Sequence, residues 1–306
     1  MSASKPGFLQ DLAWRLQAAG YVAAEQLVRL FPVDWVSGFG GWVFRHLGPL
    51  TSSQKVVDRN LRLAFPDLSP EAKAKIVAEQ WEHLGRTFIE FFINDRLTPA
   101  SGRVEVVNAE RLEEIAKSGK PVVFVSGHFS NWEIMPLVIV QSGVPCEMTY
   151  RAANNPYVDK LIRDARARYG VKLFAPKGSD GSRELLAGMK EGRSVALMND
   201  QKFNGGAALP FMGHLAHTAV APTRLALRFD TVLQPMSVQR TKGAHFRVVV
   251  HEPITLENTG HRDADLKAGV EKVNAFMEAR LREAPSQWFW VHRRWSNEAY
   301  ASLTTA

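Results

Sequence analysis

The sequence of 306 residues contains a single cysteine, Cys146. No disulfide can form within the chain, and a zinc site built from four cysteines is excluded. His214 and His217 are spaced H-x-x-H, but no third metal ligand lies near them in the sequence. We therefore expect no metal site and predict no cofactor. The scarcity of cysteine agrees with a reducing compartment.

The sequence also lacks an uninterrupted apolar run of about 18 residues, which a transmembrane helix requires. No clean apolar core of a secretory signal peptide opens the chain, because charged residues interrupt its first segment from Asp11 onward. We therefore expect neither a conventional transmembrane helix nor a secretory leader.

Acidic residues are outnumbered, with 38 lysines and arginines against 31 acidic residues and a net charge of +7. This charge suits nucleic acid, a phospholipid surface or a phosphorylated substrate, although a merely basic surface gives the same number. The sequence shows no helix-turn-helix, zinc motif or aromatic–basic pattern of RNA-binding strands. Nucleic-acid binding is therefore a remote alternative, and no nucleic-acid partner is predicted.

Two apolar stretches of helical character open the chain. Residues 8–31 repeat apolar side chains at helical spacing, and a second stretch from Trp35 to Leu47 is interrupted by glycines. Tryptophan, phenylalanine and arginine on short helices suit a membrane interface. A helical hairpin packed on its own domain is the alternative. We assign residues 1–50 to an N-terminal amphipathic, membrane-associating region.

The remaining residues, 51–306, are predicted to form one domain that is helical over 51–100 and α/β over 101–306. In the helical part, helices are expected over residues 52–64 and about 69–94. Beyond it, strands are expected over 103–107, 121–126, 146–150, 171–175, 194–198, 232–238 and 245–251. Helices are expected over 109–118, 131–142, 156–169, 182–190, 218–229 and 263–284. This alternation predicts a central, mostly parallel sheet flanked by helices.

The stretch V-S-G-H-F-S-N-W-E, residues 125–133, follows one of these buried strands. Ligands gather at the carboxyl ends of parallel strands, and histidine is well suited to take a proton near neutral pH. If the next helix begins at Asn131, Glu133 lies in its first turn and can fold back to orient the His128 ring. A satisfied structural histidine is the alternative.

No protein nucleophile accompanies this pair. The sequence contains no G-x-S-x-G motif, and Cys146 has no suitable local partner. A histidine–carboxylate pair without a nucleophile of its own would activate a hydroxyl of the substrate. Attack of that hydroxyl on an acyl thioester follows as the reaction class.

Basic residues follow the predicted strand at 146–150. Residues 151–183 carry eight basic and three acidic side chains, among them Arg151 and the helical pair Arg163 and Arg166. Guanidinium groups bind phosphate bidentately, but a solvated helix face is the alternative. Asp200 follows another strand end, either as part of the site or as a turn residue. Residues 209–213 are expected on a loop.

The segment from Phe124 to Glu133 resembles the H-x-x-x-x-D/E block of the lysophospholipid acyltransferase superfamily, and within it the bacterial lipid A biosynthesis (lauroyl and myristoyl) acyltransferases. The resemblance covers nearly the whole chain. Its further blocks are N-L-R-L-A-F-P-D-L-S at 60–69, L-G-R-T at 84–87, Tyr150-Arg151 followed by N-N-P at 154–156, D-Q at 200–201, L-P-F-M-G at 209–213 and W-F-W-V-H-R-R-W at 288–295.

The resemblance implies transfer of a fatty acyl chain from acyl carrier protein to a hydroxyl of a lipid A precursor. It implies a peripheral or monotopic enzyme on the cytoplasmic face of the bacterial inner membrane, with residues 51–306 as its acyltransferase domain. His128 maps onto the catalytic base and Glu133 onto its partner. The expected substrate-binding residues are Arg151, Arg163, Arg166, Asn131 and Asp200. Another lipid acceptor, glycerol phosphate or a phosphoinositide mannoside, is the alternative.

Overall fold

The computed structural model describes residues 7–303 apart from 173, 177 and 178. Residues 1–6 of the predicted N-terminal region, residue 173 of the predicted strand 171–175, and residues 304–306 lie outside the described residues. The helices of the first hundred residues are α1 (Phe8–Arg29), α2 (Val33–Leu47), α3 (Gln54–Ala64) and α4 (Pro70–Glu90). The later helices are α5 (Glu110–Ser118), α6 (Ile134–Gln141), α7 (Pro156–Ala167), α8 (Ser179–Lys190), α9 (Ala221–Arg228), α10 (Arg262–Glu283) and α11 (Asn297–Ser302).

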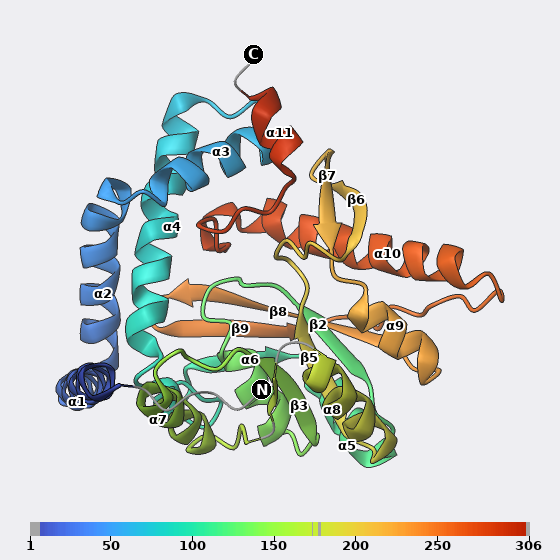
Figure 1. Cartoon of the computed structure of the whole chain (residues 1–306), viewed down its shortest axis with the longest axis horizontal. Helices are drawn as coiled ribbons and strands as arrows, with labels where there is room; N and C mark the ends of the chain where they lie inside the picture. The colour runs from blue at the N-terminus through green and yellow to red at the C-terminus, as the bar shows by residue number, and fades with distance from the viewer. Residues whose placement is uncertain (1–6, 173, 177–178, 304–306) are drawn as a thin grey trace.

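A seven-stranded sheet forms the centre of the protein (Figure 1). Its strands, in spatial order, are β1 (Val104–Val107), β9 (His245–Val250), β8 (Leu233–Lys242), β2 (Val123–Ser126), β5 (Ser194–Met198), β3 (Cys146–Tyr150) and β4 (Phe174–Pro176). All neighbouring strands run parallel except the antiparallel pair β8 and β9. The predicted α/β fold with a mostly parallel sheet flanked by helices is confirmed.

Strand β2 lies near the middle of the sheet and is buried on both faces. Val123 and Val125 pack with residues of α8, α9 and α10 on one face, whereas Phe124 packs with α5 and α6 on the other. Parallel strands that are buried on both faces have continuous apolar sequences, which explains the sequence Val-Val-Phe-Val at 122–125. The strand therefore delivers the residues after it to a fixed place at the sheet edge.

The structure also contains a β-hairpin where a loop was expected. Strands β6 (Ala207–Phe211) and β7 (His214–Thr218) pair antiparallel, separate from the main sheet. Their turn is Met212-Gly213, both with positive φ (49° and 78°), as a two-residue type I′ turn requires. Methionine is an uncommon residue at such a position, so the sequence did not show this turn.

Helix α2 continues through the glycines that were expected to interrupt it. Figure 1 shows α2 and α4 side by side, with α1 across one end of the pair. A Cβ on Gly40 would overlap Ile89 and the carbonyl of Gly85 on α4, and a Cβ on Gly85 would overlap Phe44. These glycines therefore allow two helices to approach closely rather than ending one. No helix in the described part of the chain is both long and apolar enough to cross a membrane.

A buried ion pair joins the helical layer to the sheet. The guanidinium of Arg240 on β8 binds both carboxylate oxygens of Glu90 on α4 at 2.5 and 2.8 Å, and both side chains are almost fully buried. Ser37 on α2 donates to the same carboxylate at 2.6 Å, and Asn131 donates to it at 3.1 Å. Three segments that are distant in the sequence thus converge on one carboxylate of α4.

Replacement of Glu90 by alanine is expected to lower the free energy of unfolding by about 3–5 kcal/mol, because it leaves the buried Arg240 charge without its partner. Glu105→Ala is a matched control, since it removes a carboxylate from a solvent-exposed pair with Arg247 and should cost less than about 1 kcal/mol. Urea unfolding measures both. Equal losses in the two variants would contradict a special role for Glu90.

Candidate active site

The site is built where two neighbouring parallel strands end. Strands β2 and β5 pair with Ser126 opposite Met198, so the residues after each strand leave the sheet at the same edge. His128 follows β2 and Asp200 follows β5. A Cβ on Gly127 would come within 3.1 Å of the Asp200 carboxyl carbon and 2.8 Å of the Phe129 ring. Glycine at 127 therefore permits the close approach of the two segments.

The Asp200 carboxylate holds the His128 ring. His128 Nδ1 lies 2.8 Å from Asp200 Oδ1, while the His128 backbone N–H and the Trp288 indole N–H each donate to Oδ2 at 2.8 Å. An ionised carboxylate only accepts, so Nδ1 carries the proton in the neutral ring and Nε2 carries the lone pair. The arrangement leaves Nε2 as the atom that can take a proton from a ligand.

The electrostatics favour an ionised Asp200. Burial alone would raise the pKa of this carboxyl group, but the charge of His128 and the hydrogen bonds from His128 and Trp288 outweigh it and lower the pKa to about 2. Trp132 lies edge-on to the His128 ring at 5.1 Å between centroids, and Phe289 lies at 6.1 Å. The imidazole is thus fixed by a buried anion on one side and by aromatic rings around it.

The loop after His128 is fastened to the segment 287–289. The backbone N–H of Phe289 donates to the His128 carbonyl at 3.0 Å, and that of Ser130 donates to the Gln287 carbonyl at 2.7 Å. Ser130 has a positive φ of 49°, a strained conformation for a residue with a side chain. Thr87 Oγ1 donates to the Ser130 carbonyl at 3.1 Å. The surrounding contacts hold the strained loop in place.

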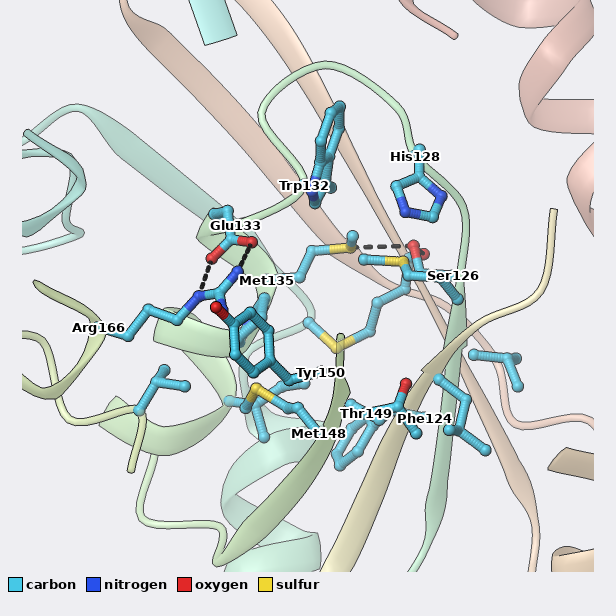
Figure 2. Close-up of a pocket in the computed structure, with 18 of the residues that line it drawn as sticks. Phe124, Ser126, His128, Trp132, Glu133, Met135, Met148, Thr149, Tyr150 and Arg166 are labelled. Atoms are coloured by element: carbon cyan, nitrogen blue, oxygen red, sulfur yellow. Dashed lines mark hydrogen bonds and ion pairs between the residues drawn. The ribbon is translucent and has the colours of Figure 1, made fainter. Parts of the chain in front are cut away.

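Glu133 does not take the position that was predicted for it. It is the N-cap residue of α6, which begins at Ile134, and both of its oxygens bind Arg166 on α7 at 2.8 and 2.5 Å. Figure 2 shows this ion pair on one side of a pocket and His128 on the other. The prediction that Glu133 orients His128 is wrong for this structure, because Asp200 occupies the Nδ1 side of the ring. The local sequence could not reveal a partner 72 residues away.

Among the predicted substrate-binding residues, the structure places Arg151 and Arg166 in the lining of the pocket. Arg163 lies outside that lining, with its guanidinium 3.0 Å from Asp159. Asn131 is fully buried and donates to Glu90 and Asn94, so it positions the loop rather than facing a ligand. Asp200 is likewise buried and acts on His128. These two assignments as substrate contacts are corrected to supporting roles.

The pocket beside His128 has a volume of about 190 Å³. His128, Trp132 and the exposed Arg151 belong to its lining, and its buried floor is apolar, with Phe124, Met135 and Ile139 among its residues. Figure 2 shows that several methionines reach into it. The site thus combines an imidazole, basic groups and a cavity with an apolar floor.

Trp288 was not singled out in the sequence as an active-site residue, although it belongs to the tryptophan-rich block at 288–295. Its indole N–H binds Asp200, and the backbone at Phe129 pairs with that at Trp288. Arg294 of the same block is buried, and its guanidinium donates to Thr218 at 2.7 Å. A cluster of tryptophans signals packing, but the sequence does not show which strand end the cluster covers.

A histidine whose Nε2 can accept a proton, at the end of a parallel strand and next to an apolar cavity, is an arrangement suited to acyl transfer. The sequence profile of the family "Bacterial lipid A biosynthesis acyltransferase" matches residues 13–297. The chain belongs to this family, and it is therefore an acyltransferase that acts on a lipid acceptor. The family implies a lipid A precursor as that acceptor.

Several characterised proteins resemble the chain. The lipid A biosynthesis palmitoleoyltransferase of Escherichia coli is 24% identical over 80% of this chain and 79% of its own. The lauroyltransferase of the same organism is 26% identical over 78% of each chain. A lipid A biosynthesis acyltransferase of Haemophilus influenzae is 23% identical over 95% of this chain and 93% of its own.

Among solved structures, the 1-acyl-sn-glycerophosphate acyltransferase of Thermotoga maritima is similar over 83% of this chain and 97% of that one. The TM-score is 0.39 and the identity 12%.

The depressed pKa of Asp200 predicts an acid-sensitive contribution to stability. Because the folded pKa of about 2 lies below the ordinary value of 3.8, the contribution is about 2 kcal/mol above pH ~4 and disappears as the pH falls through ~2. The difference in unfolding free energy between wild type and Asp200→Asn should therefore shrink by that amount between pH ~5 and ~2. Urea unfolding over this range measures it, and a constant difference would contradict the assignment.

Proposed function

We propose that this protein transfers a fatty acyl chain from acyl carrier protein to a hydroxyl group of a lipid A precursor. The observation that carries the proposal is the His128–Asp200 pair beside a narrow apolar pocket. Membership of the lipid A acyltransferase family supports the acceptor. The names of the relatives, palmitoleoyltransferase and lauroyltransferase, support a fatty acyl group as the group transferred.

The proposed reaction uses a hydroxyl of the acceptor as nucleophile. Ser126, two residues before His128, is buried and donates to the Met236 carbonyl at 2.7 Å, and neither it nor Ser130 donates to the imidazole. His128 Nε2 takes the proton of the acceptor hydroxyl as its oxygen attacks the thioester carbonyl. The tetrahedral intermediate then collapses, the carbon–sulfur bond breaks, and the imidazolium returns the proton to the departing thiolate.

Asp200 is the positioning residue in this mechanism. By accepting from Nδ1–H it fixes the tautomer in which Nε2 is basic, and its charge stabilises the imidazolium that forms during attack. Glu133 acts through Arg166. Their two-point ion pair holds the guanidinium group at the pocket edge, where the Arg166 Cζ atom lies 4.7 Å from the centroid of the Tyr150 ring. Arg166 and Arg151 are placed to meet an anionic group of the acceptor or the oxyanion of the intermediate.

The apolar pocket is proposed to hold the acyl chain. Its buried lining comes from β2, β3, β5 and α6, elements of the sheet core that do not deform easily. A chain that enters beside His128 would place its carbonyl carbon at the rim and its hydrocarbon among the methionines. The pocket would therefore select for chain length by its depth.

Purified protein with an acyl carrier protein thioester and a lipid A precursor should produce the acylated precursor. His128→Ala should lose roughly two orders of magnitude or more in kcat, because the general base is removed. Asp200→Asn should lose a comparable factor because the amide cannot fix the same tautomer. Glu133→Gln should also be impaired, since Arg166 loses its anionic partner.

Glu105→Gln, at an exposed ion pair on β1, is the control and should keep its turnover. Near wild-type activity of His128→Ala would exclude the mechanism. Transfer to glycerol phosphate or a phosphoinositide mannoside, and not to the lipid A precursor, would contradict the proposed acceptor. It would leave the proposed mechanism unchanged.

The N-terminal helices carry the features of a membrane-binding surface. Helix α2 exposes Trp35, Phe39 and Trp42, which are 72%, 63% and 60% accessible and lie on one helical face. Helix α1 and its C-cap residue Leu30 add further exposed apolar residues, which on the helix are Phe8, Leu9, Leu12, Leu16 and Leu27. We propose that region 1–50 rests on the cytoplasmic face of the inner membrane and brings the site to its lipid acceptor.

The triple variant Trp35→Glu/Phe39→Glu/Trp42→Glu should bind phospholipid vesicles at least roughly tenfold more weakly than wild type, because three side chains that would be buried in the interface become charged. The control variant Phe203→Glu/Leu215→Glu removes two exposed apolar residues outside this region and should bind normally. Vesicle co-sedimentation compares them. Unchanged binding of the triple variant would show that α2 is not the contact surface.

A further inference from the structure

A second and larger pocket lies on the other face of the sheet. Its volume is about 590 Å³, within the range of small-molecule sites, and it is formed by α8, α9 and the start of α10. It shares no lining residue with the pocket beside His128. The reaction proposed above does not use it.

The floor of this second pocket is aliphatic. Among the described residues it is lined by five leucines, which are Leu185, Leu186, Leu225, Leu227 and Leu266, and by no aromatic side chain. Leu185 and Leu225 are buried and belong to the hydrophobic core on this face of the sheet. A lining without aromatic rings offers no stacking surface for a base or sugar, whereas it suits an extended alkyl chain.

The rim is cationic. Arg224 and Arg228 lie one helical turn apart on α9, and Arg262 begins α10. In the described part of the chain none of the three forms an ion pair with a carboxylate. The one acidic residue of the lining, Asp265, already accepts from the backbone N–H and hydroxyl of Thr259 at 3.0 and 2.7 Å. The first turn of α10, whose N-cap His261 makes no side-chain cap, also carries Asp263, which lies outside the lining of the pocket.

From this combination we propose that the second pocket binds a single-chain anionic amphiphile, with a fatty-acid carboxylate as the chemical class. The alkyl chain lies on the leucine floor and the carboxylate meets Arg224, Arg228 and Arg262. Charge complementarity selects the anion, because three guanidinium groups that have no anionic partner among the described residues border an apolar hollow. The site is independent of acyl transfer at His128.

Calorimetric titration of decanoate into the full chain tests the proposal. The pocket beside His128 can also accept an alkyl chain, so the wild type should show two sites. Arg224→Glu/Arg228→Glu should abolish one of them or weaken it at least tenfold. Lys117→Glu/Lys120→Glu makes the same change of charge on exposed residues around the end of α5 and should leave both sites unchanged.

Two further arms keep the test decisive. Decanol, which has the same chain length but no charge, should bind the second pocket at least tenfold more weakly than decanoate. Ala196→Phe, which fills the pocket beside His128, should leave the arginine-dependent site intact. If the charge-reversed pair fails to fold, Arg224→Gln/Arg228→Gln replaces it. Decanoate binding that is insensitive to these arginines, or equal binding of decanol, would overturn the proposal.

Discussion

The carboxylate of Glu90 is the point on which the arrangement of the protein depends. It receives hydrogen bonds from Arg240, Ser37 and Asn131, and so ties the sheet, α2 and the loop after His128 to α4. A buried charge is tolerated only when its partners satisfy it, so these segments are held in one relative position. This network, and not the conformational preference of its own sequence, therefore sets the conformation of the loop after His128.

The loop after His128 has a strained backbone conformation that contacts with the rest of the fold stabilise. Ser130 is held at a positive φ by backbone bonds to the segment 287–289 and by Thr87 on α4. The same segment supplies Trp288, which binds the carboxylate that orients His128. The orientation of the His128 imidazole therefore depends on how the segment 287–289 packs. In the proposed mechanism His128 must meet both a hydroxyl and a thioester, and such a rigid support would position it for both.

The pocket beside His128 and the exposed face of α2 are two apolar surfaces with a proposed function, and the two functions differ. The pocket beside His128 is lined by core residues of β2, β3 and α6, whereas the aromatic face of α2 is exposed in the described part of the chain. The close contact of Gly40 with Gly85 holds α2 against α4 and keeps that face turned outward. A surface-bound enzyme of this shape would take its lipid from the bilayer and its acyl group into a cavity sized by the sheet core.

The sequence by itself determined the alternation of strands and helices and the placement of His128 after a buried strand, and it pointed to Arg151 and Arg166, which line the pocket. These follow from local patterns: apolar runs, turn residues and the position of polar residues just after a strand. Only the tertiary structure decided which carboxylate orients His128 and which asparagine is structural. Strand order is the physical reason, because pairing of β2 with β5 brings Asp200 to the histidine, whereas Glu133, five residues away, meets Arg166 across the pocket.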